Sequence, residues 1–183
     1  MFQSWIEVFP EIGLIRDREL QKQVEAVCAD ALEIGGWTLD DLDRIPFTLL
    51  IPGTSISYRT HVRAVTRMAD SVYREYEAMY EAPFRLDYDA LIAGALLHDV
   101  GKIVEYTRGA QGETVKSELG KHLRHPFSGT GLAMKHGVPA HICHIIAVHA
   151  GEGDGRYRSP EAVLVNKLDM LNFTSLRAFQ GLI

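Results

Sequence analysis

The segment from Ala90 to Asp99 constrains the fold of this chain more than any other. Residues 90–97 are apolar around nearly the whole circumference of a helix, a pattern typical of a helix that is buried on all sides. His98 and Asp99 then place two ionisable groups at the end of that helix. Burying a charge is costly unless it is paired or bound to a cation. The segment therefore predicts a central helix that ends in a polar site.

The adjacent residues His98 and Asp99 can share an ion only under one geometric condition. Successive residues of an α-helix point about 100 degrees apart, so both side chains reach one ion only near a helix end or a distortion. Gly101 follows closely, and we interpret it as the residue that lets the chain bend there. A single His-Asp dipeptide is weak evidence, so the interpretation depends on the rest of the sequence.

The other segments show helical spacing of apolar residues and no strand alternation over a useful length. We predict a helix at 90–99, capped by Asp87 or Asp89. Further helices are predicted at residues 17–34, 38–44, 58–80, 126–136, 139–149 and 160–179. The predicted fold class is therefore all-α.

Turn residues mark the ends of these helices and the loops between them. Gly35 and Gly36 stop the helix at 17–34, and Ser57 can cap the helix at 58–80. Three segments are expected to be loops: 47–56, which leads into the site, 107–120, a flexible excursion over the surface, and 151–159.

Composition limits the classes of protein to which the chain can belong. Its 183 residues, 46% hydrophobic and 23% charged, suit one globular domain. The formal net charge of -5 argues against an extended nucleic-acid surface, which needs a basic stripe. No apolar run approaches the roughly 18 residues that span a bilayer, and the first residues lack a secretory signal. We therefore expect a cytoplasmic protein in which Cys28 and Cys143 are reduced.

Histidine is the unusual residue of the composition, because seven of the eight histidines lie between His98 and His149. Imidazole and carboxylate groups together are common ligands of divalent metal ions. This stretch of the chain is therefore where we expect its chemistry.

The string LIAGALLHDVGK at residues 91–102 resembles the signature of the HD superfamily of metal-dependent phosphohydrolases. Those proteins combine a histidine on an earlier helix, the His-Asp pair and an aspartate on a C-terminal helix. Here THVRAV offers His61 and LVNKLDML offers Asp169. RHPFSG around His125 and IIAVHAGEG around His149 are similar to motifs of the binuclear branch of the superfamily. The resemblance covers roughly residues 55–175.

The resemblance implies an HD-domain helical bundle over residues 51–183, with residues 1–50 as an N-terminal helical extension packed on the same domain. It also implies two divalent metal ions that share one carboxylate. The candidate ligands are His61, His98, Asp99 and Asp169 for one ion, and His125, His149 and the bridging Asp99 for the other.

The ligand types limit the metal and its chemistry. Nitrogen and oxygen ligands without thiolate suit iron, manganese, zinc, nickel or magnesium and do not choose among them. Two ions about 3.5–4 Å apart would activate a bridging hydroxide as the nucleophile, so no serine or cysteine nucleophile is needed. Taken singly, His61, His125 and His149 are also compatible with structural places on a helix face, at a helix start and in the core.

Other residues are candidates because of their positions near these motifs. Asp99 and Lys102 are the candidate catalytic residues, and Lys102 is close enough to the pair to reach a substrate phosphate. Glu105 and Glu152 are candidates to orient water or a ligand histidine. The candidates to line the substrate entrance are Tyr58, Arg59, Arg124 and Arg158, besides Lys102. The histidines expected to be structural are His122, His136, His141 and His144, with His122 as an alternative ligand.

Hydrolysis of a phosphate ester, in a nucleotide or another small phosphorylated substrate, is the function we favour. The segment from LLHDVGKIVEY to RSPEAVLVNKLDML is similar to HD domains of YhaM-type exoribonucleases. Those enzymes carry an additional nucleic-acid-binding OB domain, for which a chain of 183 residues with a net charge of -5 leaves no room. We therefore expect a small substrate rather than RNA. The loop GDGRYRSP contains no GYP tripeptide, which disfavours cyclic di-GMP hydrolysis of the HD-GYP type.

Two alternatives stay open on sequence grounds. Mixed-valent di-iron oxygenases of the inositol and phosphonate types have the same order of six ligands, and differ in the redox state of the metal. A non-catalytic HD module with a regulatory role is the third hypothesis, although such modules usually lack one or more of the ligands that this chain keeps. The sequence does not decide the oligomeric state, and a homodimer is compatible with it.

Overall fold

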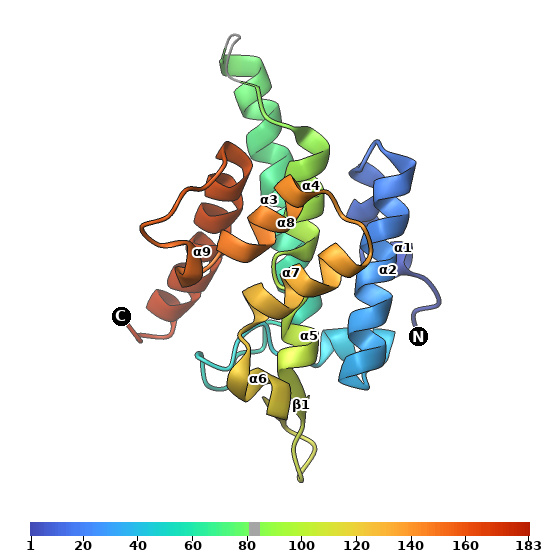
Figure 1. Ribbon diagram of the computed structural model, residues 1–183. Helices are drawn as coiled ribbons and strands as arrows, with labels where there is room; N and C mark the ends of the chain where they lie inside the picture. The colour runs from blue at the N-terminus through green and yellow to red at the C-terminus, as the bar shows by residue number, and fades with distance from the viewer. Residues whose placement is uncertain (81–84) are drawn as a thin grey trace.

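Helix α4 (Tyr88–Leu97) lies at the centre of the fold, as its sequence predicts, and every residue from Ala90 to Leu97 is buried. The computed structural model describes residues 1–80 and 85–183. Figure 1 shows α4 between α2 (Arg18–Gly35) on one side and α9 (Pro160–Phe179) on the other. Helix α3 (Tyr58–Met79) packs behind α4, and α8 (Ala140–Val148) packs in front of it.

The remaining elements are shorter and surround this centre. They are the α-helices α1 (Trp5–Val8), α5 (Lys102–Glu105), α6 (Glu118–His122) and α7 (His125–Lys135), the 3-10 helices η1 (Pro10–Leu14), η2 (Leu39–Asp43) and η3 (Gly151–Gly153), and the strands β1 (Tyr106–Arg108) and β2 (Thr114–Lys116). Helices make up nearly all of this regular structure, so the all-α prediction is confirmed. Among residues 1–80 and 85–183, none of the helices combines the length and the apolar content that crossing a membrane requires.

Side-chain caps begin the main helices where the sequence predicts them. Ser57 Oγ accepts from the main-chain N–H of Thr60 at the start of α3, and Asp87 Oδ1 accepts from Ala90 at the start of α4. Both caps satisfy a backbone donor that the helix itself leaves free. Gly36, with a φ of 67°, ends α2 in the left-handed conformation that glycine adopts without strain.

The structure differs from the prediction between residues 106 and 122. Instead of an irregular excursion, β1 and β2 pair as an antiparallel hairpin, and α6 follows. Each strand has three residues, which is too short for apolar alternation to be visible in the sequence. The predicted short helix at 38–44 is the 3-10 helix η2.

Gly101 has a different role from the one that its position suggests. Its backbone is in the ordinary right-handed helical region, with φ −63° and ψ −19°, so no unusual bend requires glycine. A Cβ at this position would lie 2.1 Å from the main-chain oxygen of His125 and 2.7 Å from the main-chain nitrogen of Gly129. Glycine is required because α7 packs directly against the backbone there.

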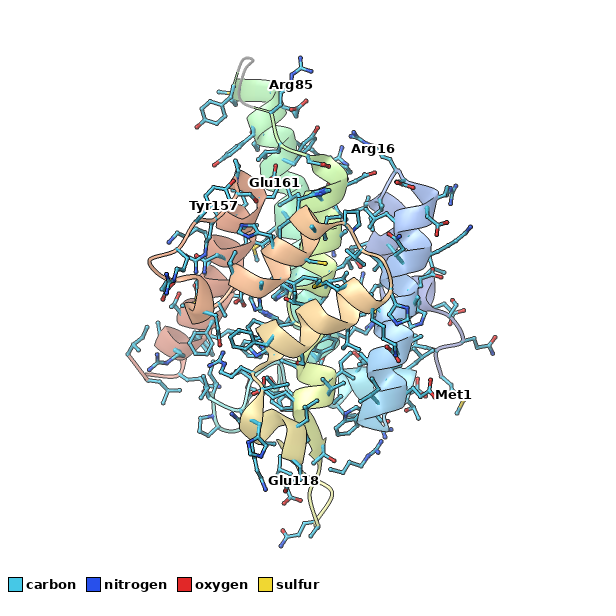
Figure 2. All side chains as sticks on the ribbon, viewed as in Figure 1. Met1, Arg16, Arg85, Glu118, Tyr157 and Glu161 are labelled. Atoms are coloured by element: carbon cyan, nitrogen blue, oxygen red, sulfur yellow. The ribbon has the colours of Figure 1, made fainter. Side chains whose placement is uncertain are left out.

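Residues 1–50 contribute to the same hydrophobic core as the rest of the chain. Phe9 and Val24, for example, belong to one cluster of buried side chains with Leu91. Trp37 Nε1 donates to the main-chain oxygen of Ile103 at 2.9 Å, which ties the end of α2 to α5. Figure 2 shows side chains filling the space between the helices.

Candidate metal centre

Five helical segments bring the six predicted ligands to one place in the middle of the molecule. The end of α4 supplies the His-Asp pair, the start of α7 and the end of α8 supply one histidine each, and α3 and α9 supply the other two ligands from inside their lengths. The ligand atoms form two groups, each compact enough to hold a metal ion. These are His61, His98, Asp99 and Asp169 in the first group, and Asp99, His125 and His149 in the second.

The first group is centred on one oxygen of Asp99. His61 Nε2 lies 3.4 Å and His98 Nε2 lies 3.4 Å from Asp99 Oδ2. His61 Nε2 is also 3.1 Å from Asp169 Oδ1. Three of these four residues are almost fully buried, and the fourth, Asp169, is partly open to a cavity. The group therefore combines two imidazoles and two carboxylates with access from one side.

The second group is centred on the other oxygen of the same carboxylate. His125 Nε2 lies 3.3 Å and His149 Nε2 lies 3.6 Å from Asp99 Oδ1. Asp99 thus turns one oxygen to each group, which is the geometry of a bridging carboxylate.

Hydrogen bonds fix which nitrogen of each imidazole faces the cluster. His98 Nδ1 lies 2.7 Å from the carbonyl oxygen of Ala95, and His149 Nδ1 lies 2.7 Å from that of Ile146. A carbonyl oxygen can only accept, so each Nδ1 carries the proton and each neutral ring keeps its lone pair on Nε2. Metal-binding histidines are oriented in this way.

Two features show that a cation fits between these atoms. Asp99 Oδ1 is buried without a hydrogen-bond partner among the described residues, an arrangement that costs about 1–3 kcal/mol. His125 Nε2 and His149 Nε2 lie 3.3 Å apart. Because the proton of His149 is held at its Nδ1, its Nε2 presents a lone pair to His125 rather than a proton. A divalent ion would satisfy both the orphaned oxygen and the facing lone pairs.

Burial and ion pairs set the charges of the cluster. Burial opposes ionisation of Asp99, but the Lys102 ammonium and the His98 imidazole hold its pKa well below the usual 3.8. Burial also opposes ionisation of Asp169, but the hydrogen bond from His61 brings its pKa to about 2. Burial lowers the pKa of His125 to about 4. In His61 the effect of burial is outweighed by Asp169 and Asp99, which raise its pKa above 6.5.

Metal affinity of the first group is expected to fall as the pH falls through the raised pKa of His61. The imidazole must lose its proton before Nε2 can bind a metal ion, so protonation competes with the metal below that pKa. The loss should approach about tenfold per pH unit. His125 adds to it only near its own pKa of about 4. Calorimetric titration with Zn²⁺ at several values between about pH 5 and 8 tests this, and a constant affinity would contradict it.

Lys102 lies directly beside the shared carboxylate. Its Nζ donates to Asp99 Oδ2 and to the main-chain oxygen of Phe47, each at 2.7 Å. Burial opposes its charge, but Asp99 raises the pKa of Lys102 above 10.5 and keeps it protonated. An ammonium has three donors, so one remains for the cavity that Lys102 lines. This position is compatible with the predicted contact to a substrate phosphate.

Glu105 holds His125 in its orientation. One carboxylate oxygen, Oε2, accepts from the main-chain N–H of His125 at 2.8 Å and from its Nδ1 at 2.9 Å. The negative charge makes the opposite nitrogen, Nε2, a better ligand. Among the predicted orienting residues, Glu105 is therefore placed for that role.

The variant Glu105→Gln is expected to bind metal about 10- to 100-fold more weakly in the second group, because the amide keeps the shape but loses the charge. Calorimetric titration of the chelated protein measures this affinity. Glu11→Gln is a matched control, since Glu11 is also buried but pairs with Arg63 away from the cluster. Equal metal affinities in both variants would show that the charge of Glu105 does not act on the site.

A cavity of about 200 Å³ opens onto the cluster and reaches its two groups through Asp169 and His125. Three cationic side chains line it, those of Lys102, Lys116 and Arg124. Its apolar lining is contributed by Phe47, Leu49, Leu50, Met170 and Phe173. The cavity therefore offers positive charge and apolar surface next to the candidate metal ligands.

Three residues predicted at the entrance do not line this cavity. Tyr58 is fully buried, with its ring edge against Phe9. Arg59 Nε donates to the main-chain oxygen of Val8. Arg158 donates to the main-chain oxygens of Val148 and Ala150, so it supports a loop rather than a substrate. The structure therefore places these three residues away from this cavity: two guanidinium groups bind backbone oxygens, and the Tyr58 hydroxyl is buried without a hydrogen-bond partner among the described residues.

Arg124 does line the cavity, and it forms an ion pair with Glu152, in which Nε lies 2.8 Å from Oε1. Glu152 therefore contacts Arg124, and it contacts none of the ligand histidines in the described part of the chain. Of the two roles expected for Glu152, this placement does not support orientation of a ligand histidine, and orientation of water stays a prediction.

The other four histidines lie outside the two groups. His122 is exposed on α6. His136 pairs with Asp30 at 2.9 Å, and His144 Nε2 accepts from the main-chain N–H of Ser159. His141 lies 3.7 Å from Asp87. None of these four histidines belongs to either ligand group in the described part of the chain.

Sequence reasoning missed two residues of the site. The Phe47 ring lies 4.7 Å from the His61 ring, and its carbonyl accepts from Lys102. Lys116 lines the cavity from β2. From the sequence, segment 47–56 is expected only to lead into the site. The polar segment around Lys116 contains no motif that marks this residue, because Lys116 approaches the cavity only through the hairpin.

Four histidines and two aspartates in two groups, joined by a carboxylate at the end of a buried helix, define an all-helical protein with an HD-type metal site. In agreement, the family model described as HD domain matches residues 58–173, which is more than half of the chain and includes all six ligands. The chain therefore belongs to the HD domain family. Comparisons with curated proteins and with solved structures gave no match.

Proposed function

We propose that this protein is a metal-dependent phosphohydrolase that cleaves a small phosphate ester. The observation that carries the proposal is the cavity that joins both ligand groups to Lys102. A site that cleaves a phosphate ester must neutralise its oxygens and activate water. The buried carboxylates and imidazoles beside the cavity are suited to hold metal ions that would do both. The Lys102 ammonium is suited to bind a phosphate oxygen.

In this proposal the six residues of the two groups would hold divalent metal ions, and Asp99 would offer one carboxylate oxygen to each group. Ions bound there would neutralise the phosphate oxygens and lower the pKa of water. Lys102 donates its third N–H to a phosphate oxygen while its other two donors stay on Asp99 and Phe47. Glu105 keeps the His125 ring directed towards Asp99.

The dimensions of the cavity favour a small substrate. Its volume of about 200 Å³ lies below the roughly 300–1,000 Å³ of pockets that enclose drug-sized ligands. The formal net charge of -5 also disfavours an extended nucleic-acid partner. We therefore infer a single phosphorylated small molecule as the substrate class.

Metal analysis of protein purified without added metal, followed by a panel of nucleotides and phosphomonoesters, tests the proposal. We expect hydrolysis with Mn²⁺, Zn²⁺ or Mg²⁺ that proceeds equally with and without dioxygen. Turnover that requires both iron and dioxygen would contradict the proposal and identify the oxygenase alternative. Metal binding without turnover of any phosphoester in the panel would favour a non-catalytic module.

A further inference from the structure

Besides buried Lys102, two exposed cationic side chains line the cavity. Lys116 and Arg124 also line it, but their side chains are 50% and 53% exposed, whereas Lys102 is buried against Asp99. The two outer cations come from different elements, the hairpin and the turn between α6 and α7. Neither contacts Asp99, and each is paired with another carboxylate, Lys116 with Glu105 and Arg124 with Glu152.

The register of the hairpin directs Lys116 towards the cavity. Lys116 pairs with Tyr106 across the two strands, and paired residues of an antiparallel hairpin lie on the same face. Tyr106 lines the cavity as well. Figure 1 shows the hairpin beside α6 at the end of the molecule below α5, and Figure 2 labels Glu118, the first residue of α6, at that end.

Both cations lie on the side of the cluster that carries His125. Lys116 Nζ is 3.5 Å from Glu105 Oε1, and the other oxygen of Glu105 holds His125. Arg124 immediately precedes His125 in the chain. The positive charges are therefore adjacent to the second ligand group and separated from it by one carboxylate or one peptide unit.

Donors of both residues are free to bind a ligand. The contact between Lys116 and Glu105 is a long one that leaves other ammonium protons unused. Arg124 forms an ion pair with Glu152 through Nε, and its two terminal amino groups donate no hydrogen bond within residues 1–80 and 85–183. Terminal guanidinium groups are suited to bind a carboxylate or a phosphate.

From this arrangement, and resting on the proposed function, we infer that Lys116 and Arg124 form an outer anion subsite. The substrate then carries a second anionic group, a carboxylate or a phosphate, besides the phosphate ester at the ligand groups. Apolar lining from Phe47, Leu50 and Phe173 would contact the part of the substrate between the two anions.

The charges around the cavity make this subsite dependent on metal. Three cationic side chains, Lys102, Lys116 and Arg124, face four anionic ones, which are Asp99, Asp169, Glu105 and Glu152. Together these side chains carry one net negative charge, and one bound divalent ion changes it to one net positive charge. We therefore expect a dianionic ligand to bind to the Zn²⁺-loaded protein and much more weakly after chelation.

Binding of two probes without a cleavable ester separates the subsite from the reaction. Methylphosphonate has one anionic group and phosphonoacetate has two, and calorimetry with the Zn²⁺-loaded protein gives both affinities. We expect phosphonoacetate to bind about tenfold more tightly, as a charge-assisted contact provides. The variants K116A and R124A should each reduce this ratio, and the double variant should bring it close to one. K116R and R124K, which keep the charge, should retain most of it.

Lys121→Ala is the matched control, since Lys121 is an exposed lysine on neighbouring α6 that is not part of the cavity lining. Equal affinities for the two probes in the wild type would overturn the subsite. So would an affinity ratio that is the same in wild type, K116A and R124A, because phosphonoacetate would then bind the metal alone. If the phosphoester panel fails while the ratio still depends on these cations, the reaction is wrong and the subsite stands.

Discussion

Asp99→Asn is expected to abolish metal binding in both ligand groups and to lower phosphoester hydrolysis about a thousandfold or more. Asp99 is shared by both groups, and each of its oxygens faces one of them, so one substitution removes a charged ligand from each. The variant also leaves buried Lys102 without its counter-ion, which should destabilise the chelated protein by on the order of 3 kcal/mol.

Metal content after gel filtration and thermal unfolding of the chelated protein measure the two effects separately. Asp41→Asn is a suitable control, because Asp41 is also buried and pairs with Arg108 far from the ligand groups. That variant should lose stability and keep its metal. Unchanged metal content in Asp99→Asn would remove the basis of the proposed function.

Gly101→Ala is expected to disturb the core and the metal centre together. Its Cβ would meet the main-chain oxygen of His125 at 2.1 Å, and backbone atoms cannot be displaced without moving α7. Overpacking of this kind costs about 1–3 kcal/mol, which corresponds to a melting temperature lower by about 3–10 °C. The same shift moves His125 away from Asp99, so metal affinity of the second group should fall as well.

Gly131→Ala provides the contrast within the same helix. Gly131 lies in α7, and a Cβ there would meet nothing within 4 Å. Alanine should stabilise the helix by about 0.5–1 kcal/mol and leave metal affinity unchanged. If Gly101→Ala behaved like Gly131→Ala in unfolding and metal titration, the proposed close contact with α7 would be wrong.

Local sequence signals were sufficient for the long helices, but not for short ones such as α1 and α6. The apolar run before His98, the caps at Ser57 and Asp87 and the stop at Gly36 each act within a few residues, and the structure has all of them. The β1–β2 hairpin could not be predicted in this way. Its strands are too short to show a pattern, and they are held by pairing with each other.

The candidate site was predictable in its ligands but not in its surroundings. The six ligands came from a resemblance to a family, because periodicity alone does not bring His61 close to Asp169. The residues around them depend on tertiary packing. Tyr58 faces the core and Arg158 binds backbone oxygens, whereas Lys116 reaches the cavity only through the register of a hairpin.

Helix α4 forms the centre of the core and is followed by the shared carboxylate, so insertions or deletions within it should not be tolerated during evolution. One inserted residue would rotate His98 and Asp99 by about 100 degrees and advance them by about 1.5 Å, while every buried side chain after the insertion would lose its packing partner. Insertions should therefore accumulate at places such as Gly109–Gly112, the tip of the hairpin, where the length of the chain affects neither the core nor the ligands.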